Sequence, residues 1–364
     1  MSLDQLPLRD ELRGAVPYGA PQLDVPVQLN TNENPYAPSA KVVQDIADAA
    51  ARAAATLNRY PDRECTGLRQ DLAAYLSKDT GVSLTDAQLW PANGSNEIMQ
   101  QLLQAFGGPG RTALSFAPTY SMYPEYARNT HTAWVTGRRQ DDFSLDLANA
   151  ADLVAQHQPS VVFLASPNNP TGTALTPGEV AAVLDLAPGL VIVDEAYGEF
   201  RRTGVPSAVE LLADHPRLVV TRTMSKAFAL AGGRLGYLAA SPAVVDAVRI
   251  VRLPYHLSAV SQAVARAALA NAAELLGQVE AIRRERDQLV ASLRGRGFEV
   301  ADSDANFVLF GRFTDRHAVW QSLLEHGVLI RETGPDGWLR VSVGTPDEMQ
   351  QFMSALDDTV GERS

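Results

Sequence analysis

The feature that most constrains the fold of this chain is a series of short apolar runs separated by stretches with helical periodicity. The runs consist mainly of Val, Ile, Leu and Ala, without the regular polar alternation of a half-exposed strand. Such runs indicate strands of a parallel sheet that is buried on both faces, with helices as the connections. The runs are Ala113–Phe116, Val161–Ala165, Leu190–Val193, Leu218–Thr221 and Leu235–Ala239. We therefore expect an α/β fold with a large domain built on a mostly parallel sheet.

The pattern changes after Arg249. A long helical segment is predicted at about residues 259–294, followed by short strands and helices that indicate a smaller α+β module. The strands are predicted at 298–301, 307–310 and 339–343, and the helices at about 314–326 and 346–358. The predicted organisation is an N-terminal arm (1–30) that packs with the small domain, a large domain (31–250) and a small C-terminal domain (251–364).

Charge, cysteine content and the apolar runs indicate which partners and which compartment to expect. The formal net charge is −11 at pH 7, which disfavours nucleic acid as a partner. A single cysteine, Cys65, allows no intrachain disulfide, as is typical of a reducing compartment. The start, Met1–Gln5, has no signal-peptide pattern, and no apolar run is long enough to cross a membrane. We expect a cytoplasmic protein that binds neither nucleic acid nor membrane.

One lysine has the chemical surroundings of a cofactor site. Lys226 follows the hydroxyl residues Thr223 and Ser225, and Arg234 comes eight positions later. Upstream, the apolar run at 190–193 ends in Asp194. These residues supply what pyridoxal phosphate needs: an amine for its aldehyde, an acid for its ring nitrogen, and cations and hydroxyls for its phosphate. Taken singly, the lysine could be a solvated surface group and the aspartate a helix N-cap.

Other polar residues follow predicted strands or open a helix. Tyr197, three residues after the aspartate, and Asn169, in the turn 166–172, could each bond the phenolic oxygen of the cofactor. Ser95 and Asn96 lie at a predicted helix start, where backbone N–H groups suit a phosphate. Ser95 as a plain N-cap is the alternative. Tyr120 could stack on an aromatic ring or belong to the core.

Other enzyme signatures are missing from the sequence. The glycines near residue 232 do not have the spacing of a dinucleotide-binding motif, and there is no P-loop, metalloprotease motif or nucleophile elbow. The six histidines are scattered, so no metal site is expected.

Several motifs together carry a family resemblance that covers nearly the whole chain. They are the segments 30–35 (NTNENP), 59–62 (RYPD), 92–97 (ANGSNE), 166–172 (SPNNPTG), 193–197 (VDEAY) and 223–228 (TMSKAF). The chain resembles the fold-type I, class I/II pyridoxal-phosphate-dependent aminotransferases, and within them the histidinol-phosphate aminotransferases. The resemblance implies the fold-type I architecture, with a large cofactor-binding domain and a smaller C-terminal domain.

The resemblance also implies roles around the cofactor ring. Lys226 would carry pyridoxal phosphate and serve as general base and acid. Asp194 would hold the pyridinium nitrogen, and Tyr197 and Asn169 the phenolic oxygen. Tyr120 would cover the ring.

A second group of residues would hold the cofactor phosphate. Within one chain these are Ser95, Asn96, Thr223, Ser225 and Arg234. Tyr60 would reach the cofactor phosphate of a neighbouring subunit, which makes the expected protein a homodimer with shared active sites.

The implied substrate-binding residues are Tyr18, Asn32, Arg331 and Arg340. Arg340 would grip the anionic end of the substrate, Arg331 would serve a substrate phosphate, and the arm segment with Tyr18 would close over that group. His256 stands where the family pattern has asparagine.

The expected function is transfer of an amino group between histidinol phosphate and 2-oxoglutarate in histidine biosynthesis, with small phosphate and dicarboxylate substrates. The alternatives are a phenylalanine-type aromatic aminotransferase, a pyridoxal-phosphate-dependent phosphothreonine decarboxylase and a non-catalytic pyridoxal-phosphate-binding protein. A nicotinamide oxidoreductase is opposed by the missing glycine motif.

Overall fold

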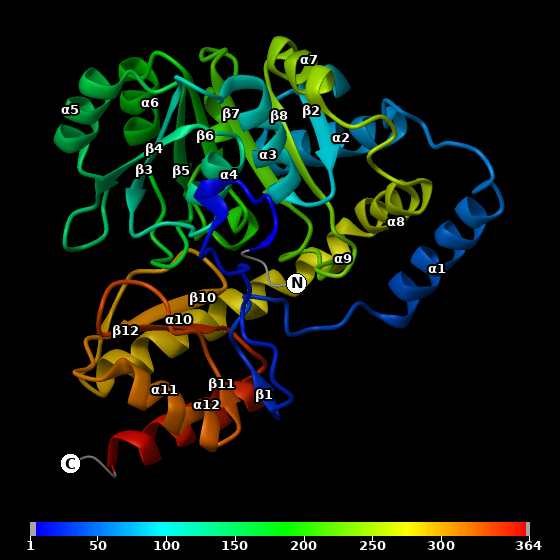
Figure 1. The fold of residues 1–364 in the computed structure, drawn as a ribbon. Helices are drawn as coiled ribbons and strands as arrows, with labels where there is room; N and C mark the ends of the chain where they lie inside the picture. The colour runs from blue at the N-terminus through cyan, green and yellow to red at the C-terminus, as the bar shows by residue number, and fades with distance from the viewer. Residues whose placement is uncertain (1–4, 362–364) are drawn as a thin grey trace.

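The large domain is an α/β unit built on one seven-stranded sheet (Figure 1). The computed structural model describes residues 5–361. In spatial order the strands are β2 (Leu89–Ala92), β8 (Gly236–Ala240), β7 (Leu218–Thr223), β6 (Leu190–Asp194), β5 (Val161–Ala165), β3 (Thr112–Ala117) and β4 (Ala133–Arg138). The strands from β7 to β4 are mutually parallel. The expectation of a mostly parallel sheet is therefore confirmed.

One predicted strand runs in the opposite direction. The run 235–239 was expected to continue the parallel sheet, but β8 pairs antiparallel with β7, and β2 pairs antiparallel with β8. The reason is the connection: no crossover helix follows β7, and the chain turns back so that the Met224 N–H donates to the Leu235 carbonyl at 3.0 Å. A parallel neighbour needs a crossover, whereas a reversal of this kind makes an antiparallel one. Lys226 lies in this reversal.

Helices cover both faces of the sheet. One face packs against α2 (Thr66–Thr80), α5 (Leu147–His157) and α6 (Pro177–Leu186), and the other against α3 (Ser95–Phe106), α4 (Tyr123–Asn129) and α7 (Pro242–Val251). Successive side chains of a strand point to opposite faces. Thus Val162 and Leu164 belong to the first layer, while Val161 and Phe163 belong to the second. The same alternation separates neighbouring functional residues at the strand ends.

The helical segment predicted at 259–294 is three successive helices. They are α8 (Ala259–Ala270), α9 (Ala272–Gly277) and α10 (Val279–Gly295). The first break is at Asn271, whose side-chain amide donates to the Ala267 carbonyl at 3.0 Å. An asparagine that bonds nearby backbone in this way competes with the helical pattern. Helix α1 (Ala40–Ala54) packs along α8.

The C-terminal part contains a three-stranded antiparallel sheet. Its order is β12 (Trp338–Ser342), β10 (Phe307–Gly311) and β9 (Glu299–Val300), with α11 (Arg316–Glu325) and α12 (Pro346–Gly361) as further elements. A separate parallel pair joins β1 (Val27–Gln28) to β11 (Val328–Leu329). The N-terminal segment is thereby attached to the small C-terminal module.

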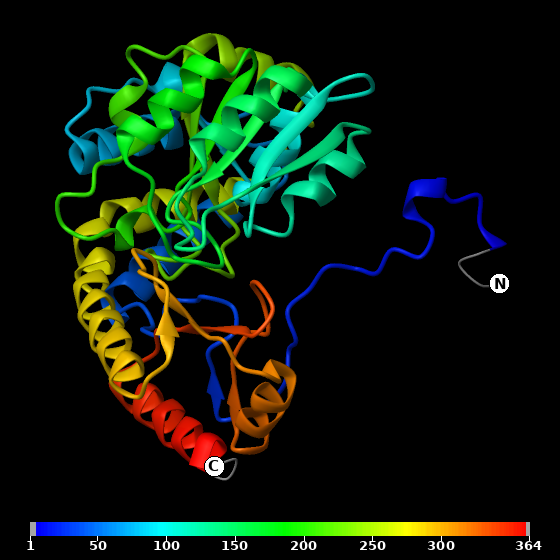
Figure 2. The same ribbon diagram turned by 90° about the vertical axis from the view of Figure 1, so that its left-hand side faces the viewer.

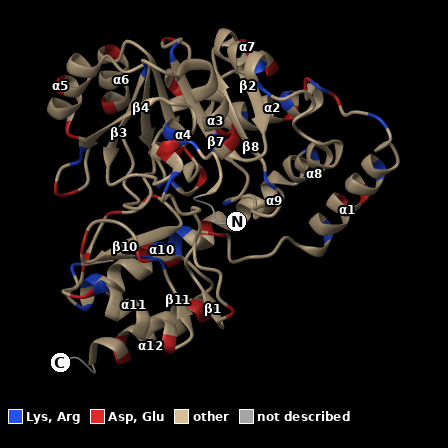
Figure 3. Cartoon of the chain, viewed as in Figure 1, with Lys and Arg blue, Asp and Glu red and all other residues tan. Residues whose placement is uncertain are grey.

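Residues 5–26 form an extended arm that includes the short 3-10 helix η2 (Asp10–Leu12). Figure 2 shows the arm extending outward from the small module, and its side chains Arg9 and Glu11 contact His131 of the large domain. Residues 1–4 and 362–364 lie outside the described residues. They include most of Met1–Gln5, the segment that has no signal-peptide pattern. The domain boundaries at residues 30 and 250 stay predictions. Figure 3 shows basic and acidic residues interspersed along the helices and loops.

Candidate active site

A cavity of about 450 Å³ lies where the carboxyl ends of the parallel strands meet the small module and the arm. Ligands of open α/β sheets collect at this edge. All but one of the predicted site residues line it. They are Tyr18, Asn32, Ser95, Asn96, Tyr120, Asn169, Asp194, Tyr197, Thr223, Ser225, Lys226, Arg234, Arg331 and Arg340.

Lys226 occupies the reversal between β7 and β8. Its Nζ donates a hydrogen bond to the Thr31 carbonyl at 2.8 Å. Burial, and next the positive charge of Arg340, lower the pKa of the Lys226 amine to about 8. A substantial fraction of this amine is therefore neutral in mildly alkaline solution, as a nucleophile or a base requires.

Asp194 ends β6 and is held by three donors. The Tyr123 hydroxyl donates to one carboxylate oxygen at 2.9 Å. The Ala196 N–H and the Thr221 hydroxyl donate to the other at 3.1 and 3.3 Å. Burial raises the pKa of Asp194, and these hydrogen bonds oppose the rise. Tyr123 was not predicted as a site residue, because nothing in the sequence links it to an aspartate 71 positions away.

Polar contacts to the N-terminal segment surround Tyr197. The Asn32 amide donates to the Tyr197 hydroxyl at 3.0 Å, and the Ser342 hydroxyl donates to the Asn32 side-chain oxygen at 3.0 Å. Asn32 has a φ of 55°, a left-handed conformation that asparagine tolerates better than most residues. Segments from the start, the middle and the end of the chain thus meet at one tyrosine.

Arg340 is buried between two loops of the cavity wall. Its Nη1 donates to the Asn169 side-chain oxygen at 2.5 Å and its Nη2 to the Asn30 carbonyl at 2.8 Å. Burial lowers the pKa of Arg340 to about 10, which still leaves it charged at neutral pH. The contact with the Asn30 carbonyl could not be predicted from the sequence, since any residue has a backbone carbonyl.

The second arginine adjoins the first through the backbone. Arg331 and Arg340 form an antiparallel bridge with N–H···O distances of 2.9 and 3.0 Å. The Arg331 guanidinium donates to the Gly19 carbonyl of the arm at 3.4 Å. The carboxylates of the neighbouring Glu332 and Asp336 lie 3.4 and 3.8 Å from Arg316, and within residues 5–361 neither forms an ion pair with Arg331.

The start of α3 and the guanidinium of Arg234 form one side of the cavity. The N-cap of α3 is Gly94, so Ser95 is not a plain N-cap but the first helical residue. Arg234 donates to the Ser225 hydroxyl at 3.3 Å, and Thr223 donates to the same hydroxyl at 3.0 Å. Backbone N–H groups of a helix start, hydroxyls and a guanidinium form a donor set that suits a phosphate.

Two glycines allow this close approach. A Cβ at Gly236 would lie 2.2 Å from the Ser95 backbone nitrogen, and one at Gly94 would lie 2.7 Å from the Arg234 Nη2. Only glycine lets the start of β8 pass directly against the start of α3. The cavity therefore fits the phosphate end of pyridoxal phosphate as well as its amine and acid requirements.

Two residues singled out in the sequence lie outside the cavity. Tyr60 is 80% exposed and stacks on Tyr255, with ring centroids 4.3 Å apart. His256 stacks on Trp90 and contacts the Pro91 carbonyl at 3.0 Å. His256 thus belongs to the packing behind the α3 start rather than to the cavity lining. Tyr120 does line the cavity and makes an edge contact with Tyr123.

Comparisons with known proteins agree with this geometry. The family model for aminotransferase class I and II matches residues 25–356. The chain is 62% identical over 361 residues to a histidinol-phosphate aminotransferase of Frankia casuarinae, covering 98% of this chain and 91% of that protein. It is 63% identical over 360 residues to one of Thermobifida fusca, covering 99% and 97%.

A solved structure gives the same result at lower identity. The histidinol-phosphate aminotransferase of Sinorhizobium meliloti, crystallised with pyridoxal-5'-phosphate, superposes with a TM-score of 0.83 at 25% identity and covers 93% of this chain and 92% of that chain. Separately, none of the helices in residues 5–361 has the length and apolar character needed to cross a membrane.

Proposed function

Because the chain belongs to the aminotransferase class I and II family, we propose that it is a pyridoxal-phosphate-dependent histidinol-phosphate aminotransferase. It transfers an amino group between L-histidinol phosphate and 2-oxoglutarate, which gives imidazole-acetol phosphate and L-glutamate, in L-histidine biosynthesis. The observation that carries the substrate assignment is the pair of arginines, Arg331 and Arg340, in the same cavity as Lys226. Histidinol phosphate has no α-carboxylate, so its phosphate must supply the anion that they bind.

The two arginines suit both partners of the reaction. A phosphate monoester carries roughly two negative charges near neutral pH, and two guanidinium groups match this better than one. A guanidinium fork also pairs with a carboxylate, so the same groups can hold glutamate and 2-oxoglutarate. Tyr18 and the arm lie beside Arg331, where they can cover the bound anion.

The cofactor supplies an electron-withdrawing ring that stabilises negative charge at the substrate carbon next to nitrogen. Asp194 would keep the ring nitrogen protonated, since hydrogen bonds from Tyr123 and Thr221 hold this buried carboxylate in one orientation. Tyr197 and Asn169 would hold the phenolic oxygen. The phosphate would be held by Ser95, Asn96, Thr223, Ser225 and Arg234.

Lys226 is the proton carrier of this proposal. Its Nζ can take a proton from the substrate carbon and return it at a neighbouring atom, because burial lowers the pKa of the amine to about 8, where both its protonated and its neutral form are present. Tyr120 would cover the cofactor ring and limit the access of water.

The assembly is proposed to be a cytoplasmic homodimer with shared active sites. Tyr60 supports this assignment because it is exposed and does not line the cavity of its own chain. In a dimer it would contribute its hydroxyl to the phosphate site of the other subunit.

A panel of amino donors tests the function. We expect the highest kcat/KM with histidinol phosphate, measured against phenylalanine, tyrosine and phosphothreonine with 2-oxoglutarate as acceptor. A preference for phenylalanine would replace the assignment by an aromatic aminotransferase, and release of carbon dioxide from phosphothreonine would replace it by a decarboxylase. Binding of pyridoxal phosphate without turnover of any donor would indicate a non-catalytic binding protein.

A further inference from the structure

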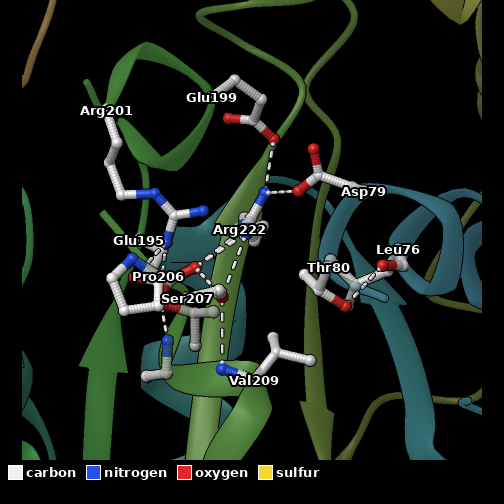
Figure 4. Close-up of polar contacts among 12 residues, drawn as sticks. Leu76, Asp79, Thr80, Glu195, Glu199, Arg201, Pro206, Ser207, Val209 and Arg222 are labelled. Carbon is white, nitrogen blue, oxygen red and sulfur yellow. Dashed lines mark hydrogen bonds and ion pairs between the residues drawn. The ribbon is translucent and has the colours of Figure 1, made fainter. Parts of the chain in front are cut away.

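A buried ionic cluster lies on the opposite face of the sheet from Asp194. Its centre is Arg222 of β7, whose side chain is 0% exposed, and its carboxylates are Glu195, Glu199 and Asp79 (Figure 4). None of these four residues lines the cavity. The alternation of side chains along a strand explains the arrangement: Thr221 faces the same side as Asp194, and Arg222 the other.

The guanidinium of Arg222 bonds the segment that carries Tyr197 on both sides of that residue. Its Nε and Nη2 lie 2.9 and 2.8 Å from Glu195, and its Nη1 lies 3.1 Å from Glu199. Glu195 and Glu199 are two residues before and two residues after Tyr197 in the sequence. A Cβ placed on Gly198 would lie 3.1 Å from the guanidinium, so the backbone next to Tyr197 rests directly on this group.

The cluster also joins the surrounding elements. Arg222 bonds Asp79 near the end of α2 at 3.0 Å and the Ser207 hydroxyl at 3.2 Å, just before the 3-10 helix η5 (Ala208–Leu211). Glu195 in turn accepts from Arg201 at 3.2 Å and from the Ala208 N–H at 2.7 Å. One guanidinium thus ties β7, the loop after β6, α2 and the start of η5 together.

Stability alone is a weak explanation for such a cluster. The cost of removing charges from water roughly cancels their attraction, so well-packed apolar residues would often serve as well. Hydrogen bonds of a planar, fork-shaped guanidinium do fix directions, which apolar contacts do not. The directions fixed here are those of the turn from Asp194 to Glu199, in which Asp194, Ala196 and Tyr197 line the cavity.

We propose that Arg222 is a positioning residue that, through Glu195 and Glu199, fixes Asp194 and Tyr197 in the orientation that binds the cofactor. Arg222 acts from behind the sheet and touches neither substrate nor cofactor. The inference rests on the proposed function, since the group to be oriented is pyridoxal phosphate.

The experiment compares Arg222→Met with Arg69→Met. Arg69 is also buried and donates to two backbone carbonyls, of Asp86 and Leu89, neither of which lines the cavity. Three quantities are measured: the urea midpoint of the cofactor-free protein, the Kd for pyridoxal phosphate by fluorescence titration, and the visible circular dichroism of the bound cofactor, which reports its fixed orientation.

We expect both variants to lower the urea midpoint, because each loses a buried arginine. Only Arg222→Met should raise the Kd, by about tenfold or more, which is the factor carried by one charged hydrogen-bond partner. The same variant should weaken the visible circular dichroism. An unchanged Kd and an unchanged dichroism in Arg222→Met would show that the cluster is only structural and would overturn the inference.

A second variant covers the case in which Arg222→Met does not fold, since that change removes the cation paired with buried Glu199 and leaves buried Glu195 with Arg201 alone. Arg222→Lys keeps the charge, but a single ammonium lacks the fork that reaches Glu195 and Glu199 together. It should also raise the Kd and weaken the dichroism, and wild-type values of both would overturn the inference. Wild-type protein that binds no pyridoxal phosphate would overturn the proposed function and this inference together. A binding wild type beside unaffected Arg222 variants overturns this inference alone.

Discussion

Replacing Tyr123 by phenylalanine tests how the protein holds a buried carboxylate. The change removes one hydroxyl that donates to Asp194 at 2.9 Å and leaves the ring, which stacks on Phe163 with centroids 4.7 Å apart. A hydrogen bond to a charged group contributes about 1.5–3 kcal/mol, and one to a neutral group about 0.5–1.5 kcal/mol. The loss should therefore depend on whether Asp194 is ionised.

The pH dependence follows from the sign of the pKa shift. Burial raises the pKa of Asp194 in the folded, cofactor-free protein, and the Tyr123 bond opposes that rise. The destabilisation by the buried charge is absent below the ordinary aspartate pKa and complete above the folded-state pKa. In Tyr123→Phe the pKa of Asp194 rises further. The variant should lose about 1.5–3 kcal/mol of unfolding free energy at about pH 8 and less at about pH 5.

The measurement is urea unfolding of cofactor-free wild type and variant at the two pH values. Tyr126→Phe is the matched control: Tyr126 lies on the same helix, and its buried hydroxyl, which adjoins Tyr120, is not among the donors to Asp194 in residues 5–361. That control should change the unfolding free energy little, and equally at both pH values. Equal losses for the two variants, or a loss at Tyr123 that does not vary with pH, would refute the reasoning.

Four further predictions concern the cavity. Borohydride reduction of the holoenzyme followed by peptide mapping should place the pyridoxyl group on Lys226, and a label on another lysine contradicts the assignment. Uptake of pyridoxal phosphate by the cofactor-free protein should accelerate as pH rises through about 8, where the amine loses its proton. Asp194→Asn should fold but lose activity by a factor on the order of 10²–10⁴ in kcat, because an amide cannot hold the ring proton by charge; activity within a fewfold of wild type removes its role. Arg331→Gln should lower kcat/KM for histidinol phosphate about ten- to a hundredfold and affect phenylalanine less; equal small effects on both donors would place Arg331 outside the substrate site. Mixing Lys226→Ala with Tyr60→Ala under subunit exchange should restore part of the activity, since one hybrid site holds both groups; a protein that is monomeric at working concentration excludes this.

The parallel core was predictable because its strands are continuous apolar runs, as at Val161–Ala165. The direction of β8 was not, since an apolar run such as 235–239 looks the same whichever way it pairs. The short strands β1, β2 and β11 were not predicted, because pairs as brief as Val27–Gln28 depend on a distant partner, here Val328–Leu329. The longer edge strand β4 was also missed, because its mixed, partly exposed sequence at Ala133–Arg138 is not a continuous apolar run. Helix breaks such as the one at Asn271 depend on the contacts of one side chain, here with the Ala267 carbonyl and with Lys41 and Asp45 of α1.

The cavity residues were predictable where a motif surrounds them, as at Lys226 and Asp194. Their supporting partners were not. Tyr123 and Arg222 act through contacts with residues far away in the sequence, and the carbonyls of Thr31 and Asn30 bind through backbone atoms that any residue would offer. The exposure of Tyr60 was not predicted from its motif. Its expected role is at the cofactor site of a neighbouring subunit.

The pairing of distant strands also sets the order in which this protein can assemble during synthesis. Strands β5, β6 and β7 follow one another along the chain and can pair as soon as each emerges, but β2, which ends at Ala92, has to wait for Gly236 to meet β8. The segment at Asn32 waits longer still, because its partner Ser342 is among the last residues made. Contacts so far apart in sequence form slowly and late. A ribosome that has released only the first two-thirds of the chain therefore presents a nearly finished sheet, and the cavity is completed only after Arg331, Arg340 and Ser342 have emerged.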